Sequence, residues 1–135
     1  MVDSNYSCDK LTPSGNLISI VDDDHSVREA MKTLLHSHGL SAAAFPSGVE
    51  FLGSPSLDDT VYLIADVNMP VLTGVELFER LKQIGHPIPT ILMTGYPDEA
   101  VRARAMRGGV VCYLLKPFKE SELIACLCSA IHSAG

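Results

Sequence analysis

The stretch that decides the fold is Val61-Tyr62-Leu63-Ile64-Ala65-Asp66-Val67-Asn68-Met69-Pro70. Five apolar residues run directly into Asp66, and Pro70 stops an extended strand because it has no backbone N–H to donate. An apolar run of this length between turn signals predicts a strand buried on both faces, as in a parallel sheet. Ligands of open α/β sheets bind at the carboxyl ends of the strands, which makes Asp66 the first candidate functional residue.

A second acidic site follows a second apolar run. Leu17-Ile18-Ser19-Ile20-Val21 leads directly into Asp22-Asp23-Asp24. If both runs are neighbouring parallel strands, several carboxylates meet at one sheet edge, which costs Coulomb energy unless a cation lies among them. The sequence therefore predicts a cation site at the carboxyl edge of the sheet.

Strand-like and helix-like segments alternate along the rest of the chain. We expect strands at 17–21, 41–45, 61–66, 90–94 and 110–115, and helices at 27–38, 47–52, 73–84, 98–107 and 119–132, with a loop at 53–60. Asp24, Ser47 and Thr73 are candidate helix caps, and Gly39 is a candidate helix end. This alternation with short links favours an α/β fold with helices on both faces of a parallel sheet.

The length predicts a single domain, and the composition predicts a core built mainly from aliphatic side chains. The 135 residues are 47% hydrophobic, include no Trp, and carry a net charge of −6, which argues against direct nucleic-acid binding by this domain. No apolar stretch approaches the roughly 20 residues of a membrane span. Residues 1–16 are polar and lack a signal-peptide core, so we expect a flexible leader at 1–16, a single domain at 17–135 and a cytoplasmic location.

The four cysteines do not form a recognisable metal or redox motif. Cys8, Cys112, Cys126 and Cys128 lack a C-x-x-C spacing. Cys126 and Cys128 are two apart on an expected helix, so their side chains point in different directions. We interpret all four as reduced structural thiols.

The groups after the strands suit phosphoryl transfer. Asp23 and Asp66, with a backbone oxygen near Asn68, offer the oxygen ligands that Mg²⁺ prefers. An aspartate can act as a nucleophile and hold an acyl phosphate. Lys116 after the fifth strand and the Thr94 hydroxyl after the fourth would then stabilise the charge on the transferring group.

Each of these residues has an ordinary explanation when it is taken alone. Consecutive acids after a strand usually form a solvated turn, and a single Asp or Thr at a strand end is often a helix or turn cap. A single lysine is usually solvated, and Tyr113 is explained by half-buried packing. The combination of these residues, each at the end of its strand, is what indicates a site.

Four motifs resemble one family. They are Ile20-Val21-Asp22-Asp23-Asp24, Asp66-x-x-Met69-Pro70-x-x-x-Gly74, Met93-Thr94-Gly95 and Tyr113-Leu114-Leu115-Lys116-Pro117-Phe118. Over residues 17–132 the sequence resembles the receiver domains of bacterial two-component response regulators. It is most similar to the FixJ-type branch, in which a receiver usually precedes a helix-turn-helix DNA-binding domain that regulates transcription.

The resemblance implies a fold and a set of roles. The fold is a flavodoxin-like, doubly wound (βα)5 three-layer sandwich with strand order 2-1-3-4-5. In that family Asp66 would accept a phosphoryl group from a sensor histidine kinase. The implied Mg²⁺ site comprises Asp22, Asp23, Asp66 and the backbone carbonyl of Asn68. Lys116, in a cis bond to Pro117, would pair with the phosphoryl group, and Thr94 and Tyr113 would switch conformation with it.

The resemblance also implies partners. A receiver is not a conventional enzyme, although it promotes its own phosphorylation and dephosphorylation. The face of the fourth helix, fifth strand and fifth helix would control an output domain or a downstream protein, and it supports phosphorylation-dependent homodimers in relatives. The sequence departs from the family pattern at Ala65, at Val111-Cys112 and at Lys119, where a helix cap is usual.

Three alternative functions are weighed against this one. The first is a receiver-like interaction module that no longer uses phosphate, and the complete acid, Thr and Lys set speaks against it. The second is an aspartate-nucleophile phosphatase, which needs an acidic residue where this chain has Asn68. The third is a flavin-binding module, and the three acids after the first strand would repel its phosphate.

Overall fold

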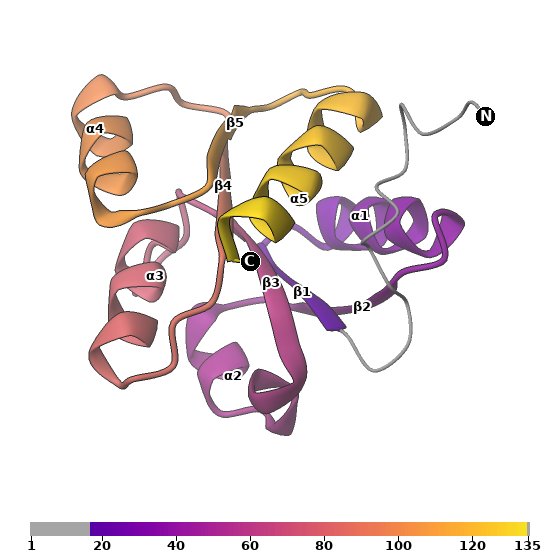
Figure 1. The fold of residues 1–135 in the computed structure, drawn as a ribbon, viewed down its shortest axis with the longest axis horizontal. Coiled ribbons are helices and arrows are strands. Elements are labelled where there is room, and N and C mark those ends of the chain that lie inside the picture. The colour runs from indigo at the N-terminus through magenta and orange to yellow at the C-terminus, as the bar shows by residue number, and fades with distance from the viewer. Residues whose placement is uncertain (1–16, 135) are drawn as a thin grey trace.

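Five parallel strands form one sheet in the order β2-β1-β3-β4-β5 (Figure 1). The computed structural model describes residues 17–134, with side chains over 17–130, so the predicted leader and Cys8 lie outside the described residues. The strands are β1 (Leu17–Val21), β2 (Ser41–Phe45), β3 (Thr60–Asp66), β4 (Thr90–Thr94) and β5 (Cys112–Leu115). This arrangement confirms the predicted doubly wound fold and its strand order.

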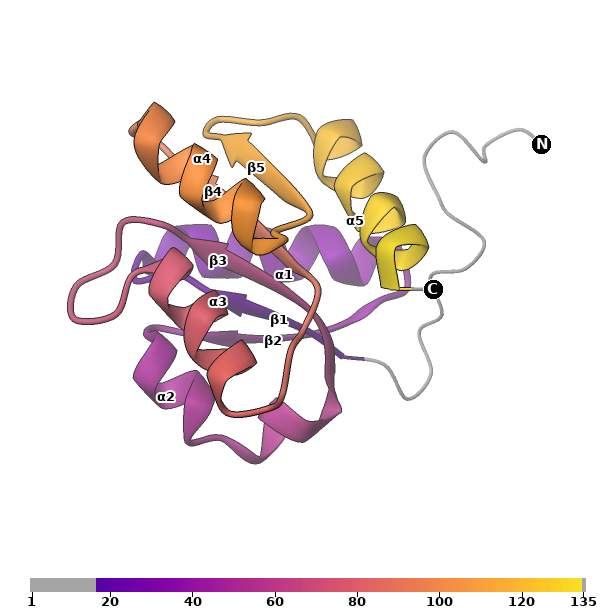
Figure 2. The same ribbon diagram turned by 60° about the vertical axis from the view of Figure 1, so that its left-hand side comes forward.

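Helices cover both faces of the sheet (Figure 2). They are α1 (His25–Ser37), α2 (Gly48–Leu52), the 3-10 helix η2 (Pro55–Asp59), α3 (Gly74–Gln83), α4 (Glu99–Gly108) and α5 (Glu120–Ala134). One core cluster packs α1 and α5 on the sheet through residues such as Leu35 and Leu127, and the other packs α2, α3 and α4 through Phe51, Leu77 and Ala105. None of the helices within residues 17–134 has the length and hydrophobicity needed to cross a bilayer.

Several predicted helix ends are confirmed. The Asp24 side chain accepts hydrogen bonds from the backbone N–H groups of Ser26 and Val27 at the start of α1. Thr73 and Glu76 form a complete capping box at the start of α3. Gly39 has φ +77° after the end of α1, a conformation that glycine adopts at little cost.

The structure corrects the sequence prediction at two places. Residues 53–60 were expected to form a loop, but Ser54 caps the short helix η2 and β3 already begins at Thr60. The fifth strand was expected from Val110, but it begins at Cys112 because the Val110 N–H bonds the Ala105 carbonyl and completes the end of α4.

At α5, Lys119 provides no capping side chain, and its backbone N–H instead donates to Glu122 Oε1 at 2.7 Å. In a capping box, the side chain of the third helical residue accepts a hydrogen bond from the backbone N–H of the N-cap residue. Glu122 supplies this half of the motif in α5. The departure from the family pattern at Lys119 is therefore compensated by Glu122.

The register of the strands brings the candidate residues to one edge. Asp66 on β3 is level with Met93 on β4, and Val21 on β1 is level with Ala65. Thr94 is level with Leu115, the residue before Lys116. The acids of two strands, the threonine and the lysine therefore share the carboxyl edge of the sheet.

Gly74 is required by the close approach of α3 to the end of β3. A Cβ added at this position would lie 2.5 Å from the Asp66 backbone oxygen, which real Cβ atoms do not tolerate. We predict that Gly74→Ala lowers the free energy of unfolding by about 3 kcal/mol, measured by urea denaturation. Gly53→Ala is the matched control, because its Cβ would lie 3.6 Å from the nearest atom and should change stability by less than about 0.5 kcal/mol. Equal effects of the two variants would contradict this explanation.

Candidate functional site

Three carboxylates meet at the carboxyl edge of the sheet. Asp22, Asp23 and Asp66 each offer an oxygen, and these oxygens all lie within 4.8 Å of one another. Asp22 and Asp66 are buried, with 1% and 5% exposure, whereas Asp23 is exposed. The convergence predicted from the two acid-tipped strands is therefore present.

The loop after β1 fixes the position of Asp22. Its Oδ1 accepts a hydrogen bond from the Asp24 backbone N–H at 2.8 Å, and its backbone carbonyl accepts one from Arg28 Nη1 at 2.8 Å. Asp24 is the N-cap of α1, so it positions the loop and lies outside the three-carboxylate cluster. The role of Arg28 was not predicted, because a residue in the first turn of a helix carries no sequence signal of a contact with the preceding loop.

Lys116 compensates two of the three negative charges. Its Nζ lies 3.0 Å from Asp22 Oδ2 and 3.0 Å from Asp66 Oδ1. Burial acts to lower the pKa of Lys116, but the hydrogen bonds to these two carboxylates and their charges outweigh it and raise the pKa. Lys116 is therefore a fixed cation between the two buried acids, and its bond to Pro117 is cis, as the resemblance implies.

Asp66 is in an unfavourable environment for an ionised carboxyl. Burial raises its pKa, the bond and charge of Lys116 lower it, and repulsion from Asp22 and Asp23 raises it further, with a net upward shift. A carboxyl with a raised pKa stabilises the fold most below its ordinary pKa, and that contribution is lost as the pH rises through the raised value. At neutral pH the ionised Asp66 therefore gains from a further cation.

Thr94 ends β4 at this edge of the sheet, and Tyr113 lies on β5, level with Leu92. Thr94 is fully buried at the end of β4, and its hydroxyl donates to Asn68 Oδ1 at 2.5 Å. Among the described side chains, Tyr113 Oη is the buried polar atom without a hydrogen-bond partner, although it approaches the backbone of Asp98. Burial raises the pKa of Tyr113.

The donor set fits a hard divalent cation. The cluster offers carboxylate oxygens from Asp22, Asp23 and Asp66, and the Asn68 backbone carbonyl follows two residues after Asp66. Thiol and imidazole ligands, which softer metals prefer, are absent from the side chains that line this cavity within the described chain. The oxygen-only donor set therefore suits a hard divalent cation better than zinc or copper.

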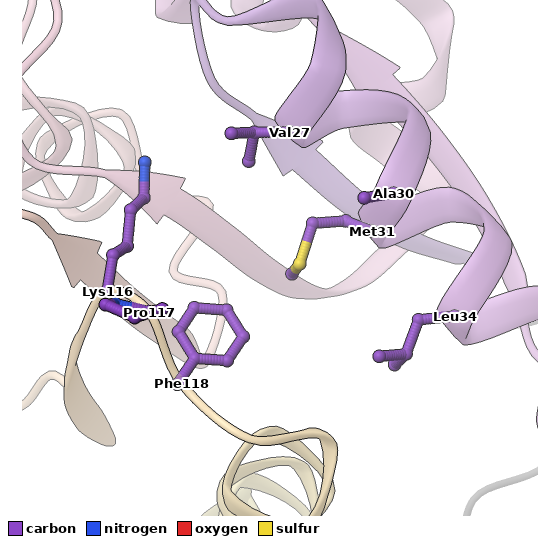
Figure 3. Close-up of a pocket in the computed structure, with 7 residues that line it drawn as sticks. All are labelled: Val27, Ala30, Met31, Leu34, Lys116, Pro117 and Phe118. Atoms are coloured by element: carbon purple, nitrogen blue, oxygen red, sulfur yellow. The ribbon is translucent and has the colours of Figure 1, made fainter.

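Two concave surfaces meet at Lys116. The first is a cavity of about 420 Å³ that contains the acid cluster. It is lined by Asp22, Asp23, Asp24, Asp66, Asn68, Gly95, Tyr96 and Lys116. The second is an apolar groove of about 520 Å³ between α1 and the segment after β5 (Figure 3). It is lined by Val27, Ala30, Met31, Leu34, Lys116, Pro117 and Phe118, with Met31 and Leu34 directed toward the Phe118 ring.

The fold and the site define a class: an open parallel α/β protein with an acidic cation pocket and a facing lysine at the carboxyl edge of its sheet. Within that class the chain belongs to the response regulator receiver family, since the sequence profile of the response regulator receiver domain matches residues 18–127. It is a receiver domain of the two-component type.

Two curated relatives and one solved structure support the assignment to the receiver family. The response regulator protein TodT of Pseudomonas putida is 35% identical over 124 residues, covering 92% of this chain and 55% of the relative. The transcriptional regulatory protein FixJ of Bradyrhizobium diazoefficiens is 37% identical over 125 residues, covering 92% and 60%. The crystal structure of FixJ-N superposes with a TM-score of 0.77 at 31% identity, covering 87% of this chain and 94% of that one. The chain spans little more than half the length of these two curated relatives.

We predict that Asp23→Ala weakens Mg²⁺ binding by about tenfold or more, because it removes one ligand of the cluster. Without metal, the same variant should be slightly more stable than the wild type, because repulsion within the cluster falls. Mg²⁺ titration and thermal unfolding in the presence of a chelator measure the two effects.

Asp24→Ala is the control for this prediction. It removes the N-cap of α1 and should cost about 1 kcal/mol of stability, and it should lower the Mg²⁺ affinity much less than Asp23→Ala does, because the Asp24 carboxylate is outside the three-carboxylate cluster. An unchanged Mg²⁺ titration in Asp23→Ala would count against Asp23 as a ligand.

Proposed function

We propose that this domain accepts a phosphoryl group from a phosphohistidine onto Asp66, with Mg²⁺ in the acid cluster, and acts as a conformational switch. The observation that carries the proposal is the placement of Lys116 Nζ 3.0 Å from Asp66 Oδ1, with two further acids alongside. This arrangement places a nucleophilic carboxylate beside the positive charge that a transferring phosphoryl group requires.

In the proposed reaction an Asp66 carboxylate oxygen attacks the phosphorus atom. The new O–P bond forms an acyl phosphate, the P–N bond breaks, and its electron pair returns to the imidazole of the donor. Lys116 Nζ and the Thr94 hydroxyl stabilise the phosphoryl oxygens. When bound by Asp22, Asp23, Asp66 and the Asn68 carbonyl, Mg²⁺ supplies positive charge for the same oxygens. We also propose that the domain itself promotes this transfer and the later hydrolysis of the acyl phosphate.

The proposed switch uses Thr94, Tyr113 and α4. Among the residues of α4, Ala105 is the one that is fully buried, so the helix is held by little apolar surface. Tyr113 packs against the same cluster as Val101 of α4 while its hydroxyl lacks a partner. A new hydrogen bond from Thr94 to the phosphoryl group would change the end of β4, which leads into α4.

The phosphate-independent interaction module is not favoured, because the acids, the lysine and the threonine converge as phosphorylation requires. The phosphatase alternative also loses support, since the Asn68 side chain is engaged by Thr94 and carries no titratable proton. We propose three interactions for this domain: with a sensor histidine kinase, with an output domain or downstream protein that controls transcription, and with a second copy of itself in a phosphorylation-dependent homodimer. We propose the cytoplasm as their location.

The apolar groove is the surface we propose for the kinase. Lys116 borders both the acid cavity and the groove, so a donor protein that places its phosphohistidine over Asp66 covers the groove as well. The apolar lining suits a helical surface that bears the histidine. Ala30 is exposed on this face of α1 and offers a position where a large side chain would block docking.

We predict that the wild type gains one phosphoryl group from acetyl phosphate in an Mg²⁺-dependent manner, and that Asp66→Asn gains none. The amide lacks the nucleophilic oxygen but retains the shape of the carboxyl, so the fold should be intact by circular dichroism. Intact mass measured side by side on the two proteins tests this. Labelling of folded Asp66→Asn to the wild-type level would refute Asp66 as the acceptor.

We also predict that Ala30→Arg slows phosphoryl transfer from a histidine kinase by about tenfold, equivalent to about 1.4 kcal/mol, and leaves labelling by acetyl phosphate unchanged. The donor is whichever purified kinase labels the wild type fastest. Ala100→Arg is the control, because Ala100 is also exposed but lies on α4, on the opposite face of the sheet. Equal slowing in both variants would contradict docking in the groove.

A further inference from the structure

The Thr94 hydroxyl has one proton and two partners in this structure. It donates that proton to Asn68 Oδ1 at 2.5 Å and accepts a hydrogen bond from the Tyr96 backbone N–H at 2.9 Å. The Tyr96 carbonyl, the other acceptor in reach, lies farther away at 3.3 Å. Because a hydroxyl donates one hydrogen bond, Thr94 cannot bind a phosphoryl oxygen until it releases Asn68.

The backbone next to Asn68 is fixed by hydrogen bonds of Val67. The Val67 N–H donates to the Met93 carbonyl at 2.8 Å, and the Val67 carbonyl accepts from the Gly74 N–H at 3.2 Å. Val67 and Met69, on either side of Asn68, are both buried. The Asn68 amide is therefore presented to Thr94 by a fixed loop, while the side chain itself remains exposed to solvent.

The register places Thr94 where this competition matters. Asp66 is level with Met93, so Thr94 lies one residue beyond the acceptor on the neighbouring strand. The amide of Asn68, two residues after Asp66, therefore binds the same hydroxyl that the phosphoryl group would recruit. Its backbone carbonyl is the atom offered to the metal, which leaves the side chain available for a separate role.

We propose that Asn68 is a positioning residue that holds the Thr94 hydroxyl in the unphosphorylated conformation and thereby weakens the interaction of the domain with the phosphoryl group. This inference rests on the proposed function, and it concerns the regulation of the same site. A net hydrogen bond contributes about fivefold to an equilibrium. Removing the Asn68 acceptor should therefore favour the switched conformation by about that factor.

The test uses trifluoroberyllate, which occupies the place of a phosphoryl group on a carboxylate, in the presence of Mg²⁺. We expect Asn68→Ala to bind it about fivefold more tightly than the wild type. In a Thr94→Ala background, Asn68→Ala should have no effect, because the hydroxyl through which it acts is gone. In a Thr94→Ser background, which retains a hydroxyl, the effect of Asn68→Ala should return.

The outcomes separate this inference from the proposed function. An affinity that Asn68→Ala leaves unchanged, or that it changes equally with and without the Thr94 hydroxyl, overturns the role of Asn68 alone. Failure of the folded wild type to bind trifluoroberyllate overturns the proposed function and this inference with it. Asn68 is exposed, so thermal unfolding should show that Asn68→Ala is folded like the wild type.

Discussion

The repulsion between carboxylates at one sheet edge is the constraint on which the rest of the site depends. Two parallel strands end in acids, and the fold brings their oxygens within 4.8 Å of one another. Lys116 compensates part of this charge from a third strand, but Asp66 still has a raised pKa. Burial and repulsion together leave a carboxylate that gains from binding a cation.

The surrounding structure keeps this unfavourable arrangement in place. Gly74 lets α3 start against the backbone of Asp66, and Arg28 ties α1 to the carbonyl of Asp22. By contrast, α4 is held by little apolar surface and Tyr113 lacks a partner for its hydroxyl. The site therefore combines a rigid acceptor with a weakly held neighbouring element, which is the combination that a switch requires.

The sequence predicted the parts of the site that depend on strand ends. Asp22, Asp66, Thr94 and Lys116 each end an apolar run or lie one residue beyond it, so topology alone brings them to one edge. It did not predict contacts that depend on side-chain rotamers and loop paths, such as the bond from Thr94 to Asn68. It also misplaced the start of β5, because the Val110 N–H bonds the Ala105 carbonyl and completes the end of α4, and the apolar pattern alone does not separate such a helix end from the first residue of a strand.

The central claim is that the phosphoryl group resides on the Asp66 carboxylate as an acyl phosphate. The most direct measurement is borohydride reduction of the phosphorylated protein, which converts an aspartyl phosphate to homoserine, followed by peptide mass mapping. The account predicts homoserine at position 66 and intact aspartate at positions 22 and 23. Homoserine at either of those positions, or a phosphoryl group that resists reduction and maps to a histidine or serine, would contradict it.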